Sequence, residues 1–600
     1  MKRPFHAWSG ISKSARGAGG KAGEGESEVI AAHPPSLPPA RSRTLLLASL
    51  ACLLPAGASA AIPALENVFP PGGQAGSAFT VTATGRFDPW PVKIWIDCPG
   101  VEFMATTNAG QFAVTIAKDA PIGPHFVRAH NADGVSEPRP FVIGRYAEVA
   151  DKEPNDHFKQ AQPLAALPAV VNGKLEKRGD VDTFAVRAEA GRWLVARLDG
   201  YALGSPMDPF LHLLDERGAK LAYSADSHNL DPVLAFRIER PGTYHLQVSA
   251  FVYPPAADVQ LAGSASCVYR LTISDAPMAF GSLPAGAQRG RKSTVQLLGW
   301  NLAAASAARD VDATGAPPLA DATRLQPDCA ERSLPVLLGD FPELVESEPN
   351  NTATNAQTVE VPCFVSGRIE RPGDEDRFAF SAKKGERFNF RVNGDALGSQ
   401  LDAWVRVEDA AGKQLAFADD ATTSVHDPVL AWTAPADGRY VVAIGDLFRK
   451  GAPEFRYRLS LTPPRADFRV TADAHSYGVG RGLTNTIKLT VTQLEGGFTN
   501  LVASVAGLPA GVTVAPVDVP AKGGEVKLVL AAGEMATLGG VPIQALVTVR
   551  DSVPPRARAA TFNLKTGPIP GDLLLNQIDQ FWLTVTPGTP PPAPPAKKKR

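Results

Sequence analysis

Apolar and polar residues alternate over short stretches along most of this chain. Early examples are residues 79–83 and 92–96, and a later one places Tyr244, Leu246 and Val248 on one side of a segment. A period of two puts one face of a segment in a core and the other in water, which predicts β-strands. Glycine, proline and aspartate bound these stretches and favour turns between strands. The pattern predicts an all-β chain built from β-sandwiches.

Two kinds of sequence block occur twice. Gly72 and Gly85 return as Gly286 and Gly299, and both pairs are separated by 214 residues (286 − 72 and 299 − 85). A constant spacing indicates a repeated domain rather than a chance turn composition. A longer block recurs densely, since the residues Ala-Leu-Gly-Ser and Asp-Pro-Val-Leu-Ala each appear in both copies, at the positions 202–205, 396–399, 231–235 and 427–431.

The repeats divide the chain into a duplicated two-domain module followed by one further sandwich. We therefore predict five β-sandwiches in a row, flanked by two segments outside the fold. The predicted segments are 1–60 (extension and signal peptide), 61–146 (Ig-like), 147–275 (acid-motif copy one), 276–341 (Ig-like), 342–463 (acid-motif copy two), 464–568 (Ig-like) and 569–600 (Pro-rich basic tail).

Acidic and amide side chains gather at the start of each longer repeat. The first copy reads Glu-Pro-Asn-Asp and then Gly-Asp-Val-Asp, and the second reads Glu-Pro-Asn-Asn and then Gly-Asp-Glu-Asp. Oxygen-only ligands crowded into a few residues suit calcium, which accepts six to eight oxygens. The alternative is a solvated acidic turn, because the same residue types form turns. The candidate ligands are Asp151, Glu153, Asn155, Asp156, Asp180 and Asp182, and then Glu346, Glu348, Asn350, Asn351, Asp374 and Asp376.

A second acidic cluster also recurs. It consists of Asp208, Asp226 and Asp231, repeated as Asp402, Asp420 and Asp427. Another cation or ligand site is one interpretation. The favoured interpretation is structural, because an aspartate before a proline, as in the Asp-Pro pairs of this cluster, is good turn chemistry.

Composition and an N-terminal pattern bear on the compartment. The net charge of −1 over 600 residues argues against a global electrostatic grip on nucleic acid or acidic membranes. The basic residues Arg41 and Arg43, an apolar run over 44–54 and the small residues 58–60 predict a secretory signal peptide cleaved before Ala61, although a membrane anchor stays possible. No later run is long enough to span a bilayer, so the mature chain is expected to be secreted, periplasmic or held at the cell surface.

Four cysteines remain after the predicted cleavage. Cys98, Cys267, Cys329 and Cys363 allow three disulfide pairings, and their spacing shows no zinc pattern. Alignment of the repeats places Cys267 where the second copy has Phe455, which predicts a packed, inert thiol. A Cys329–Cys363 bridge stays open as a possibility.

The chain carries none of the sequence signatures of catalysis that we sought. The zinc-protease H-E-x-x-H, the nucleophile-elbow G-x-S-x-G and the P-loop pattern are all missing from the sequence. His426 beside Asp427 could imitate an acid–base pair, but the first copy has Leu230 in place of the histidine. We therefore predict that the protein is not an enzyme.

The longer repeats resemble the bacterial pre-peptidase C-terminal (PPC) domain family. The resemblance lies in Glu-Pro-Asn-Asp/Asn, Gly-Asp-x-Asp-x-Phe, Asp-x-x-Gly and a closing Gly-x-Tyr. It implies jelly-roll-like sandwiches found beside secreted peptidases, and calcium binding at the acidic segment as in clostridial collagenases. Asn351 departs from the more acidic form and weakens the second site. The Pro-Gly-Gly-Gln sandwiches resemble Ig-like/TIG modules, and the domain order is similar to that of secreted planctomycete-type proteins.

The expected function is that of a secreted, non-catalytic, multidomain binding or scaffold protein with calcium-stabilised PPC-like domains. Its expected partners are an extracellular protein or a polysaccharide, and not nucleic acid. The alternative is an accessory or targeting component of a secreted peptidase or hydrolase system. A basic tip at residues 597–600 could touch an anionic envelope surface, although four charges on a free end are more often simply solvated.

Overall fold

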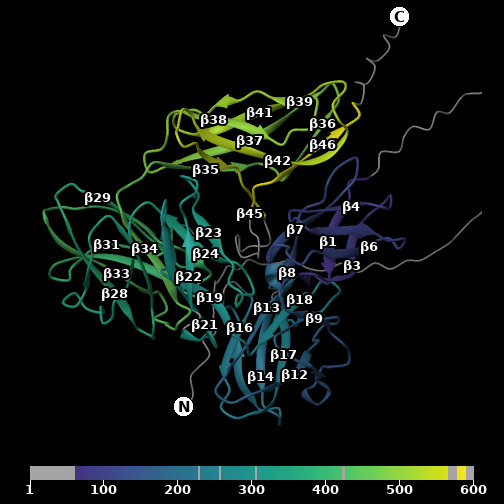
Figure 1. The fold of residues 1–600 in the computed structure, drawn as a ribbon, viewed down its shortest axis with the longest axis horizontal. Helices are drawn as coiled ribbons and strands as arrows, with labels where there is room; N and C mark the ends of the chain where they lie inside the picture. Colours follow the sequence, from purple (N-terminus) through teal and green to yellow (C-terminus); the bar gives the residue numbers. More distant parts are fainter. Residues whose placement is uncertain are drawn as a thin grey trace, which may run out of the picture. The chain divides into compact units, whose positions relative to one another are not determined.

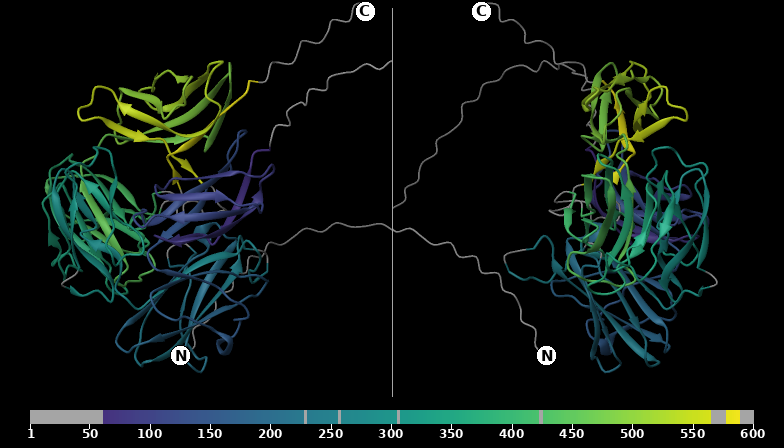
Figure 2. Two further views of the ribbon diagram at one scale, coloured as in Figure 1. Left: turned by 45° about the vertical axis from the view of Figure 1, so that its right-hand side comes forward. Right: turned by 90° about the vertical axis from the view of Figure 1, so that its left-hand side faces the viewer.

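The computed structural model describes residues 61–227, 230–255, 258–304, 307–421, 426–564 and 577–588. Within them nearly all regular structure is β-strand, so the all-β prediction is confirmed (Figures 1 and 2). The described helical elements with printed bounds are single turns of 3-10 helix: η1 Phe158–Gln160, η2 Tyr201–Leu203 and η4 Asp395–Leu397. No helix in this part of the chain is long and apolar enough to cross a bilayer. The predicted signal peptide and the basic tip lie outside the described residues.

The first sandwich pairs two four-stranded sheets, with the strand orders β1-β3-β6-β5 and β2-β8-β7-β4. Its core includes Val81, Phe112 and Phe141, which come from alternate positions of strands in both sheets. The strands are β1 Ala64–Phe69, β2 Gly72–Gln74, β3 Ala78–Arg86, β4 Lys93–Ile96, β5 Val101–Ala105, β6 Gln111–Ile116, β7 Gly123–His130 and β8 Arg139–Gly144.

The first acid-motif copy consists of two five-stranded sheets, ordered β10-β12-β17-β14-β15 and β16-β13-β18-β11-β9. Phe184, Leu246 and Leu271 are fully buried between these sheets. The strands are β9 Ala147–Ala150, β10 Gln162–Pro163, β11 Ala169–Lys174, β12 Asp182–Ala188, β13 Trp193–Asp199, β14 Met207–Leu214, β15 Lys220–Ser224, β16 Val233–Arg237, β17 Gly242–Val252 and β18 Val268–Ser274.

The second acid-motif copy repeats this topology strand for strand. Its sheets are ordered β26-β28-β33-β30-β31 and β25-β27-β34-β29-β32. The duplication seen in the sequence therefore extends to the strand order. The strands are β25 Glu343–Val345, β26 Gln357–Thr358, β27 Cys363–Arg368, β28 Glu375–Ala382, β29 Arg387–Asn393, β30 Ala403–Asp409, β31 Gln414–Ala418, β32 Val429–Thr433, β33 Gly438–Asp446 and β34 Arg456–Thr462.

Between the two acid-motif copies lies a smaller sandwich of two three-stranded sheets, ordered β19-β21-β22 and β20-β24-β23. The repeated Gly85 and Gly299 sit where a first strand bulges against its neighbour. A Cβ at either position would collide with the backbone carbonyl of Ala64 or Met278, which explains the glycines. The strands are β19 Met278–Leu283, β20 Gly286–Gln288, β21 Lys292–Trp300, β22 Ala308–Asp312, β23 Ala322–Leu325 and β24 Leu334–Gly339.

The other repeated glycines make room for a buried arginine of the following domain. A Cβ at Gly144 would collide with the guanidinium of Arg270. A Cβ at Gly72 would collide with the backbone carbonyl of Val142 and would also come within 3.0 Å of that guanidinium. Arg270 is buried and lies 2.6 Å from a carboxylate oxygen of Glu148. The buried arginine packs against the glycines of one sandwich and forms an ion pair within the acid-motif domain that follows, so it stabilises the contact between the two domains. The second module has the same arrangement, in which Gly286 and Gly339 pack against Arg458 and this arginine pairs with Glu343.

The C-terminal sandwich has sheets ordered β35-β37-β41-β39 and β36-β46-β42-β38-β40, with β43 beside β42 and a β44-β45 pair. Strand β46, Phe581–Thr586, hydrogen-bonds to β36 and β42 and buries Phe581 and Leu583. The predicted boundary at residue 568 was therefore wrong, because an alternating segment follows the Pro- and Gly-rich stretch and completes the sheet. The remaining strands are β35 Asp467–Ala472, β36 Ser476–Gly480, β37 Thr484–Leu494, β38 Leu501–Ala506, β39 Val512–Val514, β40 Val517–Asp518, β41 Gly524–Ala532, β42 Gly539–Val549, β43 Arg556–Ala559, β44 Phe562–Asn563 and β45 Gln577–Ile578.

The four described cysteines are free thiols. Cys267 lies in the core of the first acid-motif copy, as the alignment of the repeats predicted. Cys329 and Cys363 do not form the bridge that the sequence left open. Burial raises the pKa of Cys363 to about 12 and that of Cys98 to about 11, so both are held as unreactive thiols.

Candidate cation sites

The first acid-motif copy gathers its predicted ligands from three short segments. The Glu-Pro-Asn-Asp segment follows β9, Asp180 ends the turn before β12, and Asp182 is the first residue of β12. The β9 strand pairs in parallel with β11, and the chain then turns back into β12. Side chains distant in sequence therefore meet where the segment that follows β9 approaches the start of β12, two strands that are labelled in Figure 1.

Two overlapping sets of three carboxylates form in this copy. One oxygen from each of Asp151, Glu153 and Asp182 lies within 4.8 Å of the others, and the same holds for Glu153, Asp156 and Asp180. Glu153 belongs to both sets. The sixth predicted residue joins them, because the Asn155 side chain donates a 2.6 Å hydrogen bond to Asp151 and its backbone N–H donates one of 3.1 Å to Glu153.

The inner residues of this group are buried with unused acceptors. Asp182 and Asn155 are fully buried, and the Oδ1 atom of each has no hydrogen-bond partner among the described residues. A buried polar oxygen without a partner costs free energy, and a buried unpaired carboxylate costs more. A cation bound between them would supply the missing partner.

The carboxylates also raise one another's pKa values. Burial, followed by the charge of Asp151, raises the pKa of Asp182 to about 9. Burial, followed by the charge of Glu153, raises the pKa of Asp151 to about 6. Such shifts mark carboxylates that lack a compensating positive charge. The nearby lysine pairs with two other carboxylates of the group, since the Lys177 amine lies 3.3 Å from Asp156 and 3.4 Å from Asp180.

The second copy brings together Glu348, Asp374 and Asp376 within 4.8 Å. Asn350 is fully buried, and neither atom of its amide has a hydrogen-bond partner in the part of the chain that the structure describes. Asp376 is fully buried, and burial followed by the charge of Glu346 raises its pKa to about 10. The same kind of unpaired oxygen-rich site therefore recurs.

Two predicted ligands of the second copy behave differently from their counterparts. Glu346 stands outside the set of three and accepts a hydrogen bond from the backbone N–H of Arg368 (2.7 Å). Its second oxygen lies 3.0 Å from the hydroxyl oxygen of Tyr457, whose proton points to the nearer Asp376. Asn351 donates its side-chain N–H to Asp374. A neutral amide in place of the first copy's Asp156 leaves this site with less negative charge.

Sequence reasoning missed a tyrosine and a glycine beneath each site. The buried Tyr269 hydroxyl donates to Asp182 (2.5 Å), and the buried Tyr457 hydroxyl donates to Asp376 (2.6 Å). A Cβ at Gly173 would overlap the Tyr269 ring, so this glycine makes space for it, as Gly367 does for Tyr457. The sequence did contain a signal for this tyrosine. Both copies have tyrosine, with its polar hydroxyl, at the same position of a strand whose other core-facing residues are apolar.

The second acidic cluster does not hold together as one site. Asp231 is buried and accepts three backbone N–H groups, from Gly200 (3.1 Å), Tyr201 (2.9 Å) and Ala202 (2.8 Å), which orders the turn around η2. Asp427 does the same around η4. The structural interpretation therefore fits these two aspartates.

Substitution of Asp231 by Ala is expected to lower the free energy of unfolding of its domain by about 3 kcal/mol, because three buried N–H donors lose their acceptor. Asp231→Asn should cost less, since its remaining oxygen still accepts part of this set. Differential scanning calorimetry of the full chain measures both variants. Equal melting of Asp231→Ala and wild type would contradict the structural role.

The other members of this cluster stay near the surface. Asp402, Asp420 and His426 bring ligand atoms within 4.8 Å, and the His426 Nδ1 lies 3.4 Å from Asp420. The histidine thus faces Asp420, and Asp427 faces the backbone around η4, so the imagined acid–base pair with Asp427 does not form. In the first copy, burial followed by the charge of Asp226 raises the pKa of Asp208 to about 6.

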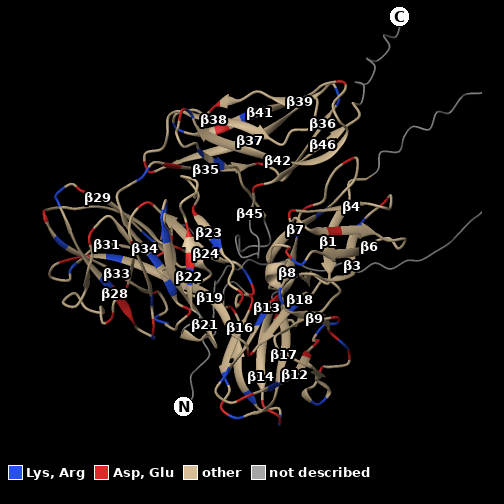
Figure 3. Cartoon of the chain, in the orientation of Figure 1, with Lys and Arg blue, Asp and Glu red and all other residues tan. Residues whose placement is uncertain are grey.

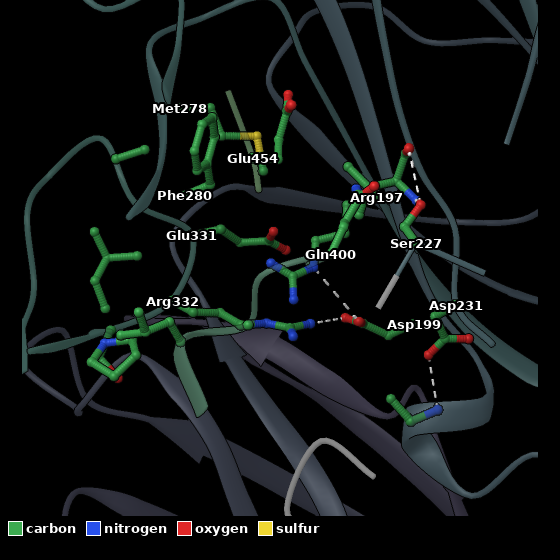
Figure 4. Close-up of a pocket in the computed structure, with 18 of the residues that line it drawn as sticks. Arg197, Asp199, Ser227, Asp231, Met278, Phe280, Glu331, Arg332, Gln400 and Glu454 are labelled. Atoms are coloured by element: carbon green, nitrogen blue, oxygen red, sulfur yellow. Dashed lines mark hydrogen bonds and ion pairs between the residues drawn. The ribbon is translucent and has the colours of Figure 1, made fainter. Parts of the chain in front are cut away.

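A cavity of about 310 Å³ is lined mainly by the first acid-motif copy and the sandwich that follows it (Figure 4). Residues of the second acid-motif copy, among them Gln400 and Glu454, also line it. Asp199 forms an ion pair with Arg332 and lies 3.9 Å from the Arg197 Nε, while Glu331 accepts a hydrogen bond from Thr272. These charges point toward one another in Figure 4. Their pairing serves the contact between the two domains and forms no nucleophile–base arrangement among the residues labelled there.

Comparison with known proteins finds similarity over parts of the chain. No protein-family model matches the chain. A probable subtilase-type serine protease of Deinococcus radiodurans is 36% identical over 103 residues, which are 16% of this chain and 14% of the protease. The chain thus spans about a seventh of that protein.

Two solved structures illustrate the structural likenesses. The pre-peptidase C-terminal domain of a collagenase from Bacillus anthracis matches with 11% identity and a TM-score of 0.15, over 20% of this chain and 100% of that domain. The four N-terminal Ig domains of Dscam1 match with 9% identity and a TM-score of 0.18, over 88% of this chain and 100% of that chain. The assignment of both acid-motif copies to the PPC family stays a prediction.

Proposed function

We propose that this protein is an exported, non-catalytic scaffold or binding protein in which each acid-motif domain holds calcium. The observation that carries the proposal is the convergence of buried, unpaired oxygens at equivalent places in two copies, with Asp182 and Asn155 in one and Asp376 and Asn350 in the other. Carboxylate and amide oxygens are the ligands that calcium prefers, and its flexible geometry tolerates the differences between the copies.

Calcium has a physical role in such a chain. Each site joins the segment that enters the domain to the first strands of the sandwich, so a bound ion would neutralise clustered carboxylates that otherwise repel one another. The domain entrance would become stiff, and the neighbouring sandwiches would be presented in a fixed way to an extracellular protein or polysaccharide.

A second candidate function is that of an accessory component of a secreted peptidase system. The similarity to a probable subtilase-type serine protease over 103 residues favours it. In this case the catalytic domain belongs to a separate peptidase, and the present protein positions that peptidase or its substrate.

The purified full chain is expected not to cleave casein or gelatin, with or without calcium. Mass spectrometry of the substrates after prolonged incubation measures this. Cleavage that a single substitution in this chain abolishes would overturn the non-catalytic proposal. Faster gelatin cleavage when the chain is added to a subtilase-type protease of the same organism would favour the accessory role.

A further inference from the structure

An exposed group of aromatic side chains lies on the first acid-motif copy, on the sheet face that points away from the core. Phe210 (β14), Tyr223 (β15) and Phe251 (β17) form it, and ring centroids are 5.1 Å apart for Phe210–Phe251 and 6.0 Å apart for Phe210–Tyr223. Tyr223 is 59% exposed and Phe251 is 37% exposed. We call this group the aromatic surface. Two of its three strands, β14 and β17, are labelled in Figure 1.

The second copy has an aromatic surface at the equivalent places. Trp404 (β30) and Phe417 (β31) stack with centroids 6.2 Å apart and planes 27° apart, and Leu447 follows β33. The pairing of β30 with β31 matches that of β14 with β15 in register, so these positions correspond. Phe417 is 44% exposed and Leu447 is 43% exposed, whereas Trp404 is only 8% exposed and supports Phe417 from below. The residues differ between the copies, whereas the exposed apolar character recurs.

Hydrogen-bonding groups of both signs surround each aromatic surface. In the first copy the Lys220 amine lies 3.2 Å from the His212 ring. Burial, followed by the charges of Asp226 and Asp208, raises the pKa of the Tyr223 hydroxyl. Burial raises the pKa of Asp226, and the positive charge of Lys450, a residue of the second acid-motif copy, opposes that rise. Donors and acceptors are therefore mixed beside the rings, with no excess of one charge among these groups.

The rim of the second aromatic surface is mixed in the same way. The Arg406 guanidinium lies 4.7 Å above the Trp404 ring, and Asp402, Asp420 and His426 stand close to one another. In Figure 3 the acidic and basic residues are likewise interspersed over the described strands. A strongly charged ligand would meet repulsion from one half of either rim, so both surfaces suit a neutral partner.

Leaving an aromatic ring exposed to water is unfavourable, because its apolar surface gains nothing from burial in a core. Exposed apolar patches therefore often mark interaction sites. A pyranose ring has an apolar C–H face, which packs on an aromatic ring, and a rim of hydroxyls that both donate and accept hydrogen bonds. That chemistry complements exposed rings bordered by carboxylates, an amine, a guanidinium and imidazoles. A polymer of identical units can occupy both surfaces at once, which two weak sites on one chain would exploit.

We propose that the two aromatic surfaces bind a neutral polysaccharide, one stretch of sugars on each acid-motif domain. The inference deepens the proposed binding function by naming the partner's chemistry and the faces that contact it. It does not depend on the calcium sites, which are formed by the segments that enter these domains.

Binding of the full chain to insoluble cellulose, chitin, xylan and mannan tests the inference, with collagen and gelatin as protein alternatives. Wild type is expected to bind at least one of the polysaccharides. Tyr223→Ala and Phe417→Ala should each weaken binding about 3- to 10-fold, and the double variant should lose more, because both surfaces hold one polymer. Met535→Ala, which removes an 86% exposed side chain of the C-terminal sandwich, is the matched control and should bind like wild type.

Tyr223→Phe keeps the ring and should retain most of the affinity, and unchanged melting temperatures show that the variants fold. Binding to none of the polysaccharides, equal binding by the double variant, or binding to collagen alone would overturn the inference. Calcium titration of the same preparations separates the two proposals. A chain that binds calcium but no polysaccharide contradicts only this inference, and a chain that binds polysaccharide but no calcium contradicts only the calcium proposal.

Discussion

Calcium at millimolar concentration is expected to raise the melting temperature of the purified chain by about 5–10 °C relative to EGTA. A ligand present at a hundred times its dissociation constant adds about 2.7 kcal/mol to the state that binds it. In a domain of this size, 1 kcal/mol shifts the melting temperature by about 2–4 °C or somewhat more. The gain arises because the ion supplies partners for the unpaired oxygens of Asp182 and Asp376, which the folded chain otherwise buries alone.

Differential scanning calorimetry resolves this effect domain by domain. The transitions of the two acid-motif domains should move, and that of the C-terminal sandwich should stay. Magnesium at the same concentration should give a smaller shift, because it requires stricter octahedral geometry and gives up its water reluctantly. Superimposed traces in calcium and EGTA would contradict the proposal.

The Asp182→Asn variant is expected to change stability in opposite directions with and without calcium. In EGTA it should melt at or above the wild-type temperature, because the substitution removes a buried carboxyl group whose ionised form has no compensating positive charge. The oxygen of the new amide can still accept the hydrogen bond that Tyr269 donates to Asp182. In calcium it should melt below wild type, because a ligand charge is lost. If Asp182 had a purely structural role, the Asp182→Asn substitution would instead destabilise the domain both in EGTA and in calcium.

Matched variants sharpen this comparison. Asp376→Asn should reproduce the reversal in the second copy, and the double variant should show almost no response to calcium. Asp208→Asn changes a half-buried carboxylate of the same domain outside the site and should keep the full calcium response. If Asp182→Asn responds to calcium as strongly as wild type does, the assignment of Asp182 as a ligand is wrong.

Much of the fold could be predicted because the signals are local. The alternation of Tyr244, Leu246 and Val248 is read directly along one strand, and in the structure all three face the core of the first acid-motif copy. The strand Phe581–Thr586 was overlooked because proline and glycine around it suggested a tail, whereas its place in the sheet is set by the distant β36 and β42.

In the candidate site, too, the features that could be predicted are local in sequence and those that were missed depend on distant strands. Its acidic residues are close in sequence and were found there, whereas Tyr269 reaches Asp182 only through the pairing of distant strands. Neighbours in sequence can also diverge. Asp427 accepts N–H groups of the backbone around η4, whereas the neighbouring His426 faces Asp420.

The most direct test of the central claim is a crystal structure of the chain grown in calcium, with anomalous scattering used to locate the ions. The account predicts an ion bound by oxygens of Asp151, Glu153 and Asp182, and a second bound by Glu348, Asp374 and Asp376. Well-ordered density that shows only water at both places, with the carboxylates turned apart, would contradict it.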